Sequence, residues 1–217
     1  MAYNPQIHHR RPIRLKEYDY SRAGLYFITI CCQDRNCRFG DITVGASLAD
    51  AQHADAQHAD AQHADAQHAD ARHADARHAD AQHADARMIL NEYGTIARDE
   101  WEKLPKRFPN VELDVFQVMP NHVHGIIVLN EPPTVWAGAS WAGASPAPTV
   151  GHIIGAYKSL VAKACLDICK SKNEMLGKLW QRNYYEHIIR SEPSYRTISD
   201  YIINNPAKWK EDKFYEP

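Results

Sequence analysis

Apolar residues along the chain follow two periods, and the shorter one marks strands. Strands are expected where β-branched and aromatic residues run together or alternate with polar ones. Such segments are residues 25–31, 111–118, 122–129 and 180–189, with residues 38–44 as either a short partner strand or a loop. Only Met119, Pro120 and Asn121 separate the second segment from the third, so we expect an antiparallel hairpin there.

The longer period marks helices between these strands. Apolar residues recur at three- and four-residue spacing in residues 88–104, 150–170 and 194–204, and a last short helix is expected from residue 207. Pro105 and Pro206 are expected to end the first and third helices. The order strand, helix, strand pair, helix, strand, helix predicts an α/β (α+β) sandwich, with helices packed on a largely antiparallel central sheet.

A low-complexity insertion interrupts this pattern. From Ala49 the pentad Ala-Asp-Ala-Gln/Arg-His repeats seven times to His83, and a broken copy ends at Arg87. A period of five advances about 140° per pentad on an α-helix, so the histidines would spiral around its axis. We expect residues 49–87 to project from the body as a solvated helix or a disordered loop. The insertion is either a tolerated surface feature or a metal buffer.

The remainder of the chain is expected to form one domain. It comprises residues 1–48 and 88–217, with residues 130–149, rich in Pro, Gly, Ala and Ser, as a flexible linker within it. The repeat holds eight aspartates against three arginines, so the overall net charge of −2 hides a mildly basic body.

Composition excludes membrane and secreted classes. No stretch approaches the run of about 18 apolar residues that a membrane span needs. The polar, basic start of the chain lacks the apolar core of a secretory signal. The five cysteines form no CxxC pair and are expected to be reduced thiols. These features predict a cytoplasmic protein.

Two histidines carry the first candidate chemistry. His122 and His124 lie two residues apart on an expected strand, so their side chains project from the same side while Val123 points into the core. Two imidazoles so placed can hold one divalent cation. The two histidines of a lone His-x-His pattern can also be ordinary surface or core residues. The pattern occurs in metallohydrolases and nucleotidyl transferases as well.

A tyrosine on the last long helix is the second candidate. Tyr201 and Asn205 lie four residues apart and share a helix face. A tyrosine can attack phosphorus, and a metal with an amide ligand can polarise the phosphate. Tyrosines on amphipathic helices are also core residues, and spacing alone does not favour Tyr201 over Tyr184, Tyr185 or Tyr195.

Three ordered motifs carry a family resemblance. Met119-Pro120-Asn121-His122-Val123-His124-Gly125 resembles the signature of single-tyrosine HUH transposases, an insertion-sequence family in which two histidines flank a hydrophobic residue. The segments 179–190 and 200–206 resemble the C-terminal half of the REP-associated tyrosine transposases within it, and residues 11–30 resemble their opening. The similarity covers most of residues 10–210 outside the insertion and the linker, which depart from the family pattern.

The resemblance implies a fold, a reaction and a set of residues. The fold would be HUH endonuclease-like, and the protein a metal-dependent transposase that cleaves and rejoins single-stranded hairpin DNA from repeated palindromic elements. His122, His124 and Asn205 would hold Mg²⁺ or Mn²⁺, and Tyr201 would form a 5′-phosphotyrosine intermediate. Trp180, Gln181, Arg182 and His187 match a further motif near the DNA or the active site.

Basic residues are the expected DNA contacts. The N-terminal arm carries Arg10, Arg11 and Arg14, and Lys158 and Arg182 are further candidates for phosphate binding. Each is also compatible with a solvated charge. We expect a monomer or a homodimer associated with the nucleoid. The competing hypotheses are a non-catalytic binder of DNA hairpins and, less favoured, a metallohydrolase that uses the histidine pair.

Overall fold

The hairpin expected around Pro120 lies in the central sheet. In the computed structural model, β4 (Val111–Met119) and β5 (His122–Leu129) are antiparallel neighbours. β1 (Gly24–Cys31) pairs with the other edge of β5, and β6 (Tyr185–Ile189) pairs with β1. The sheet has the order β4-β5-β1-β6, and every neighbouring pair is antiparallel. The mixed fold with a largely antiparallel sheet is therefore confirmed.

The structure describes residue 15 and residues 17–44, 86–131 and 148–216. Arg10, Arg11 and Arg14 lie outside the described residues. So do nearly all of the pentad insertion and most of the expected linker. The predictions made for those segments stay predictions.

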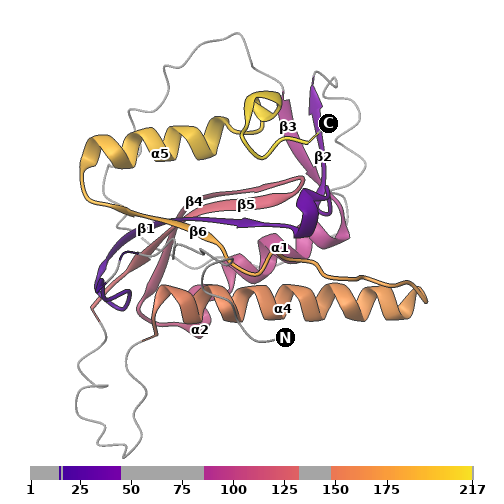
Figure 1. Ribbon diagram of the computed structural model, residues 1–217, viewed down its shortest axis with the longest axis horizontal. Helices are drawn as coiled ribbons and strands as arrows, with labels where there is room; N and C mark the ends of the chain where they lie inside the picture. Colours follow the sequence, from indigo (N-terminus) through magenta and orange to yellow (C-terminus); the bar gives the residue numbers. More distant parts are fainter. Residues whose placement is uncertain (1–14, 16, 45–85, 132–147, 217) are drawn as a thin grey trace, which may run out of the picture.

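Helices cover both faces of the sheet (Figure 1). α1 (Glu92–Glu102), α2 (Leu104–Arg107) and α4 (Val150–Ser171) lie on one face, and α5 (Glu192–Asn204) lies on the other. Short 3-10 turns, η1 (Gln33–Arg35) and η3 (Trp209–Glu211), complete the described elements. No helix among the described residues is both long and apolar enough to cross a membrane.

The strand alternation of β5 divides the interior into two clusters. Val123 and Ile127 belong to the larger cluster, under α1 and α4, together with Trp101 and Tyr157. Ile126 belongs to the smaller cluster, which α5 closes. Because successive strand side chains point to opposite faces, His122 and His124 lie on the α5 side with Ile126. The sheet is thus buried on both faces, and the histidines face the helix that carries Tyr201.

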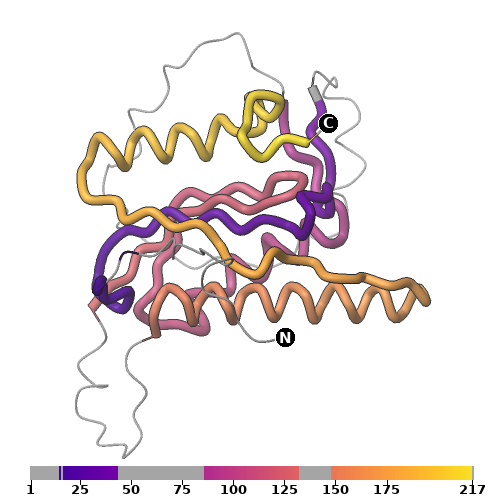
Figure 2. The backbone as a smooth tube through the Cα atoms, viewed as in Figure 1, coloured from indigo at the N-terminus to yellow at the C-terminus, as the bar shows by residue number. Residues whose placement is uncertain are grey.

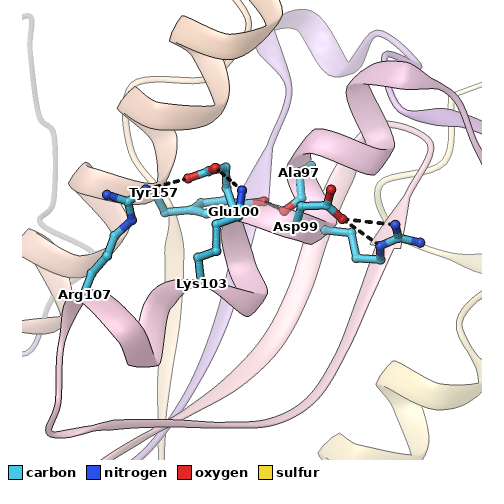
Figure 3. A network of polar contacts seen from close by, with 7 residues as sticks. Ala97, Asp99, Glu100, Lys103, Arg107 and Tyr157 are labelled. Carbon is cyan, nitrogen blue, oxygen red and sulfur yellow. Dashed lines mark hydrogen bonds and ion pairs between the residues drawn. The ribbon is translucent and has the colours of Figure 1, made fainter. Parts of the chain in front are cut away.

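Polar contacts join the helices of the larger layer (Figure 3). The hydroxyl of Tyr157 on α4 donates to the carbonyl oxygen of Ala97 on α1, at 3.0 Å. The carboxylate of Glu100 on α1 lies 2.9 Å from Lys103 and 3.2 Å from Arg107 on α2. These contacts tie α1 to both α2 and α4.

Two helix boundaries differ from the expectation. The helix expected from Met88 begins only at Glu92, with Asn91 as its N-cap, because residues 86–90 form strand β3 (Ala86–Leu90). Pro105 does not end a helix: it lies in the first turn of α2, where its missing N–H costs no hydrogen bond. The strand expected over 180–189 is shorter, since Trp180 forms only an isolated bridge with Cys32 before β6 begins.

A separate two-stranded ribbon explains where the insertion enters. β2 (Gly40–Val44) pairs antiparallel with β3, and Val44 is the register partner of Ala86. The expected partner strand at 38–44 therefore exists, but it pairs with the end of the repeat and not with the central sheet. The chain leaves the described structure and returns to it at adjacent strand ends (Figure 2).

Candidate active site

The two histidines of β5 form the floor of the site. His122 follows the tight turn at Pro120 and Asn121, and both imidazoles are fully buried, with ring centroids 4.2 Å apart. Gly125 follows them on the strand, where a Cβ atom would stand 2.5 Å from the indole of Trp101. The glycine of the motif is thus required by packing on the face opposite the histidines.

The hydrogen bonds of His122 leave one ring nitrogen available. The side-chain amide of Asn121 donates to the carbonyl oxygens of Arg35 and Phe214, so its own oxygen faces His122. That oxygen accepts from Nδ1 of His122 at 2.8 Å. Nε2 is then the unprotonated nitrogen. It is buried and has no hydrogen-bond partner among the residues that the structure describes, which is the condition of a ligand atom without its cation.

His124 connects the sheet to the last helix. Its Nδ1 lies 2.8 Å from the hydroxyl oxygen of Thr29 on β1, and its Nε2 lies 3.1 Å from the hydroxyl of Tyr201. Burial lowers the pKa of His124, and the neighbouring His122 lowers it further. Burial also lowers the pKa of His122. Both rings are therefore neutral near pH 7, as metal binding requires.

Tyr201 reaches the two histidines from α5, the helix that packs on their face of the sheet. It is half-buried on α5, and its ring meets Phe27 and His124. Its hydroxyl donates to Oδ2 of Asp212 at 2.6 Å. Burial, followed by this hydrogen bond, raises the pKa of Tyr201 well above its usual 10.0. The phenol is thus protonated in this arrangement.

Asp212 is the member of the site that the sequence analysis missed. It follows η3 and is buried, and its carboxylate accepts from Tyr201 and from the side-chain amide of Asn205, both at 2.6 Å. Burial alone would raise the pKa of Asp212, but the hydrogen bonds from Tyr201, Asn205 and the N–H of Phe214 lower it below its usual 3.8. No local pattern marks this residue, because a charged segment near a chain end is ordinary surface.

These side chains fit a divalent cation. Ligand atoms of His122, His124 and Asp212 lie within 4.8 Å of one another, and no other such group of three occurs among the described residues. Oδ1 of Asn205 is buried and has no partner, so it can add an amide oxygen. Imidazole nitrogens with carboxylate and amide oxygens form a donor set that divalent first-row metals and Mg²⁺ accept. The structure thus brings His122, His124, Tyr201 and Asn205 together, and their roles stay predictions.

The C-terminal segment covers this site. The ring of Phe214 lies 4.9 Å from that of His122 and 5.8 Å from that of His124, and Trp209 meets His122 at 5.8 Å. Figure 2 follows the chain from α5 back over the same face of the sheet. Side chains that include Phe214 and Trp209 therefore lie against the imidazoles and help to bury them.

Two of the expected DNA contacts lie elsewhere. Lys158 is on α4, and its ammonium donates to the carbonyl oxygens of Gln181, Arg182 and Asn183 at 2.7, 3.3 and 3.2 Å. Burial lowers its pKa to about 8. Arg182 is exposed in the segment that Lys158 holds. Binding of DNA by either residue stays a prediction.

The remaining motif residues have separate surroundings. Trp180 is buried, donates to the carbonyl oxygen of Lys158 at 3.0 Å and contacts the ring of Phe39. His187 is exposed on β6 opposite Phe27 of β1. The first belongs to the core, and the second lies on the α5 face of an edge strand.

Comparisons with known proteins give one close relative. The chain is 35 % identical over 220 residues to an uncharacterized protein of Haemophilus influenzae, covering 98 % of this chain and 97 % of that protein. No family model matches.

Among solved structures, the chain is similar to a REP-associated tyrosine transposase bound to a REP hairpin. The identity is 19 %, the coverage is 92 % of this chain and 77 % of that one, and the TM-score is 0.43. A second structure, provisionally named as a transposase of Deinococcus radiodurans, is 16 % identical over 88 % of this chain and 95 % of that one, with a TM-score of 0.37.

Proposed function

The chain belongs to the same family as the uncharacterized Haemophilus influenzae protein, and we propose that it is a transposase that cleaves and rejoins single-stranded hairpin DNA. The observation that carries the proposal is the position of Tyr201, whose hydroxyl lies 3.1 Å from His124 and 2.6 Å from Asp212. A phenol at the edge of a metal-binding cluster is the arrangement that tyrosine attack on a phosphodiester requires. The ordered sequence motifs support the same reaction.

Each side chain of the site has a role in this reaction. His122, His124 and Asp212 would hold Mg²⁺ or Mn²⁺, with Asn205 as a further ligand. When bound, the cation would act as a Lewis acid that orients the scissile phosphate and offsets its developing charge. Thr29 holds the ring of His124 in place, and Asn121 fixes that of His122 so that it presents Nε2.

The covalent step uses Tyr201. Its hydroxyl oxygen attacks phosphorus, a bond forms between them, and the bond from phosphorus to the 3′ oxygen breaks. Oδ2 of Asp212, 2.6 Å away, accepts the phenolic proton. The leaving 3′ oxygen takes a proton from solvent, so the products are a 5′-phosphotyrosine and a strand with a free 3′ hydroxyl. Attack by another 3′ hydroxyl reverses the step, so strand transfer needs no external source of energy.

The test is the formation of a covalent adduct. Purified protein is mixed with Mg²⁺ or Mn²⁺ and hairpin oligonucleotides from the flanks of its own gene, and the products are separated on a denaturing gel. We expect an adduct with the wild type and none with Tyr201→Phe or His122→Ala. The matched control is Tyr195→Phe on the same helix, whose hydroxyl bonds Asp114 and not the histidines. This control variant should keep the adduct.

Other outcomes identify the competing functions. Hairpin binding that is equal in all variants, with no adduct, would indicate a non-catalytic DNA-binding protein, and full burial of both imidazoles under Phe214 is compatible with that function. Cleavage of a generic phosphodiester without an adduct would indicate a metallohydrolase. An adduct that persists in Tyr201→Phe would mean that another tyrosine is the nucleophile.

A further inference from the structure

An exposed tyrosine lies on the sheet face that carries the site. Tyr185 begins β6, which pairs with β1 on one side, and its register partner is Thr29. Thr29 in turn is the register partner of His124 on β5. Tyr185 is therefore in the same cross-strand row as His124, two strand spacings or about 10 Å away. Its side chain is 43 % exposed and belongs to neither buried cluster.

Two cations lie against the neighbouring ring of Phe214. The ring of Tyr185 lies 5.8 Å from that of Phe214, which is the ring that covers the histidines. The ammonium of Lys213 lies 4.8 Å from the centre of the Phe214 ring, and the guanidinium carbon of Arg35 lies 5.6 Å from it. Because the Phe214 ring lies 4.9 Å from that of His122, both cations lie beside the candidate site.

The existing partners of these cations are weak. Arg35 pairs with Glu216 at 3.5 Å, and the two side chains are 35 % and 53 % exposed. Exposed pairs of this kind contribute little to stability, so a phosphate can replace the carboxylate. Lys213 is exposed, and its ammonium forms no ion pair with any residue that the structure describes.

An exposed aromatic ring, with two cations on the ring next to it, offers the chemistry that binds a single nucleic-acid strand. Bases stack on aromatic side chains whatever their sequence, and cations contact the phosphates between them. We propose that Tyr185, Arg35 and Lys213, around the Phe214 ring, bind the nucleotide next to the scissile phosphate. Tyr185 stacks on its base, and Arg35 and Lys213 contact its phosphate. This inference rests on the proposed function and adds the path of the strand from Tyr201 toward β6.

The test measures the stacking of one base at a time by its fluorescence. The probe is a hairpin oligonucleotide from the flank of the gene, with 2-aminopurine placed in turn at each position of its single-stranded tail. Binding to the Tyr201→Phe protein with Mn²⁺ avoids cleavage. We expect quenching at a position next to the cleavage site, retained in Tyr185→Phe and lost in Tyr185→Ala. Loss of this stack should also weaken binding about tenfold.

The cations are tested by salt dependence. Arg35→Gln and Lys213→Gln should each reduce the slope of log affinity against log salt by about 0.7, the value for one phosphate on a single strand. Lys170→Gln is the matched control, since Lys170 is exposed on α4, which covers the opposite face of the sheet. Ile203→Ala, at a side chain that is 54 % exposed on α5, controls for loss of an exposed apolar group.

The outcomes separate this inference from the proposed function. Quenching that persists in Tyr185→Ala, or is lost equally in Tyr185→Phe, overturns the stacking role, and unchanged salt slopes overturn the phosphate contacts. In those cases the wild-type protein still forms its covalent adduct. A wild type that forms no adduct and binds no hairpin refutes the proposed function, and this inference with it.

Discussion

The carboxylate of Asp212 accepts hydrogen bonds from Tyr201, Asn205 and the N–H of Phe214. It is also the acid grouped with the two imidazoles as a possible metal ligand. These two observations make it the residue on which cation binding should depend most strongly, after the histidines themselves.

Asp212→Asn should weaken Mn²⁺ binding, because the substitution removes the negative charge but keeps the shape of the side chain. We expect the Kd, measured by titration calorimetry on the protein without DNA, to rise by about tenfold or more. Glu211→Gln removes the neighbouring exposed acid and should leave the Kd unchanged. An equal loss in both variants would mean that overall charge, and not ligation, attracts the cation.

The buried histidines also predict a pH dependence of stability. Their pKa values in the folded protein lie below the usual 6.5, so the unfolded chain takes up protons first as the pH falls. Stability is then lost below pH 6.5, by roughly 1.4 kcal/mol per pH unit for each histidine that stays neutral. Urea unfolding in EDTA from pH 7 down to about 4.5 would measure this loss. The double variant His122→Gln, His124→Gln should show a flatter profile.

At the scale of elements, β5 and α1 meet through a glycine. Gly125→Ala would place a Cβ atom 2.5 Å from the indole of Trp101, which is itself packed against Phe116 and Tyr157. We expect overpacking to destabilise the protein by about 1–3 kcal/mol in urea unfolding.

Substitution of a second glycine should have the opposite effect on stability. Gly155 is exposed within α4, and a Cβ atom there would have no neighbour within 4 Å. Gly155→Ala should stabilise the protein by about 1 kcal/mol, since alanine favours the helix. If Gly125→Ala and Gly155→Ala shifted stability in the same direction, this account of the packing would be wrong.

At the scale of the whole molecule, the insertion is attached at the end of a ribbon. Val44 and Ala86 are register partners, so a two-residue Asn-Gly turn can replace residues 45–85. Loop shortening changes closure entropy only slowly, by about 0.6 kcal/mol per halving, and in the stabilising direction. The shortened protein should melt no lower than the wild type and should form the same covalent adduct. A lost adduct with an unchanged melting temperature would assign the insertion a part in DNA cleavage.

Local periodicity alone determined the main elements of the fold. The alternation in residues 111–118 and 122–129 and their short link predicted the hairpin, because side-chain period and turn length are local properties. The prediction was wrong where pairing with a distant strand overrode a local helical period. Ile89 fits the helical period of Tyr93 and Ile96, but pairing with β2 makes it part of a strand, since strand partners lie far away in the sequence.

The site, like the fold, was partly predictable from local sequence patterns and partly decided by the tertiary structure. His122 and His124 share a strand face, and Tyr201 and Asn205 share a helix face, so the sequence could group each pair. Only the tertiary structure decided that the two pairs meet, that Asp212 joins them and that Phe214 covers them. The physical reason is that packing of α5 and the returning C-terminal segment on the sheet depends on contacts between distant residues, which no local period encodes.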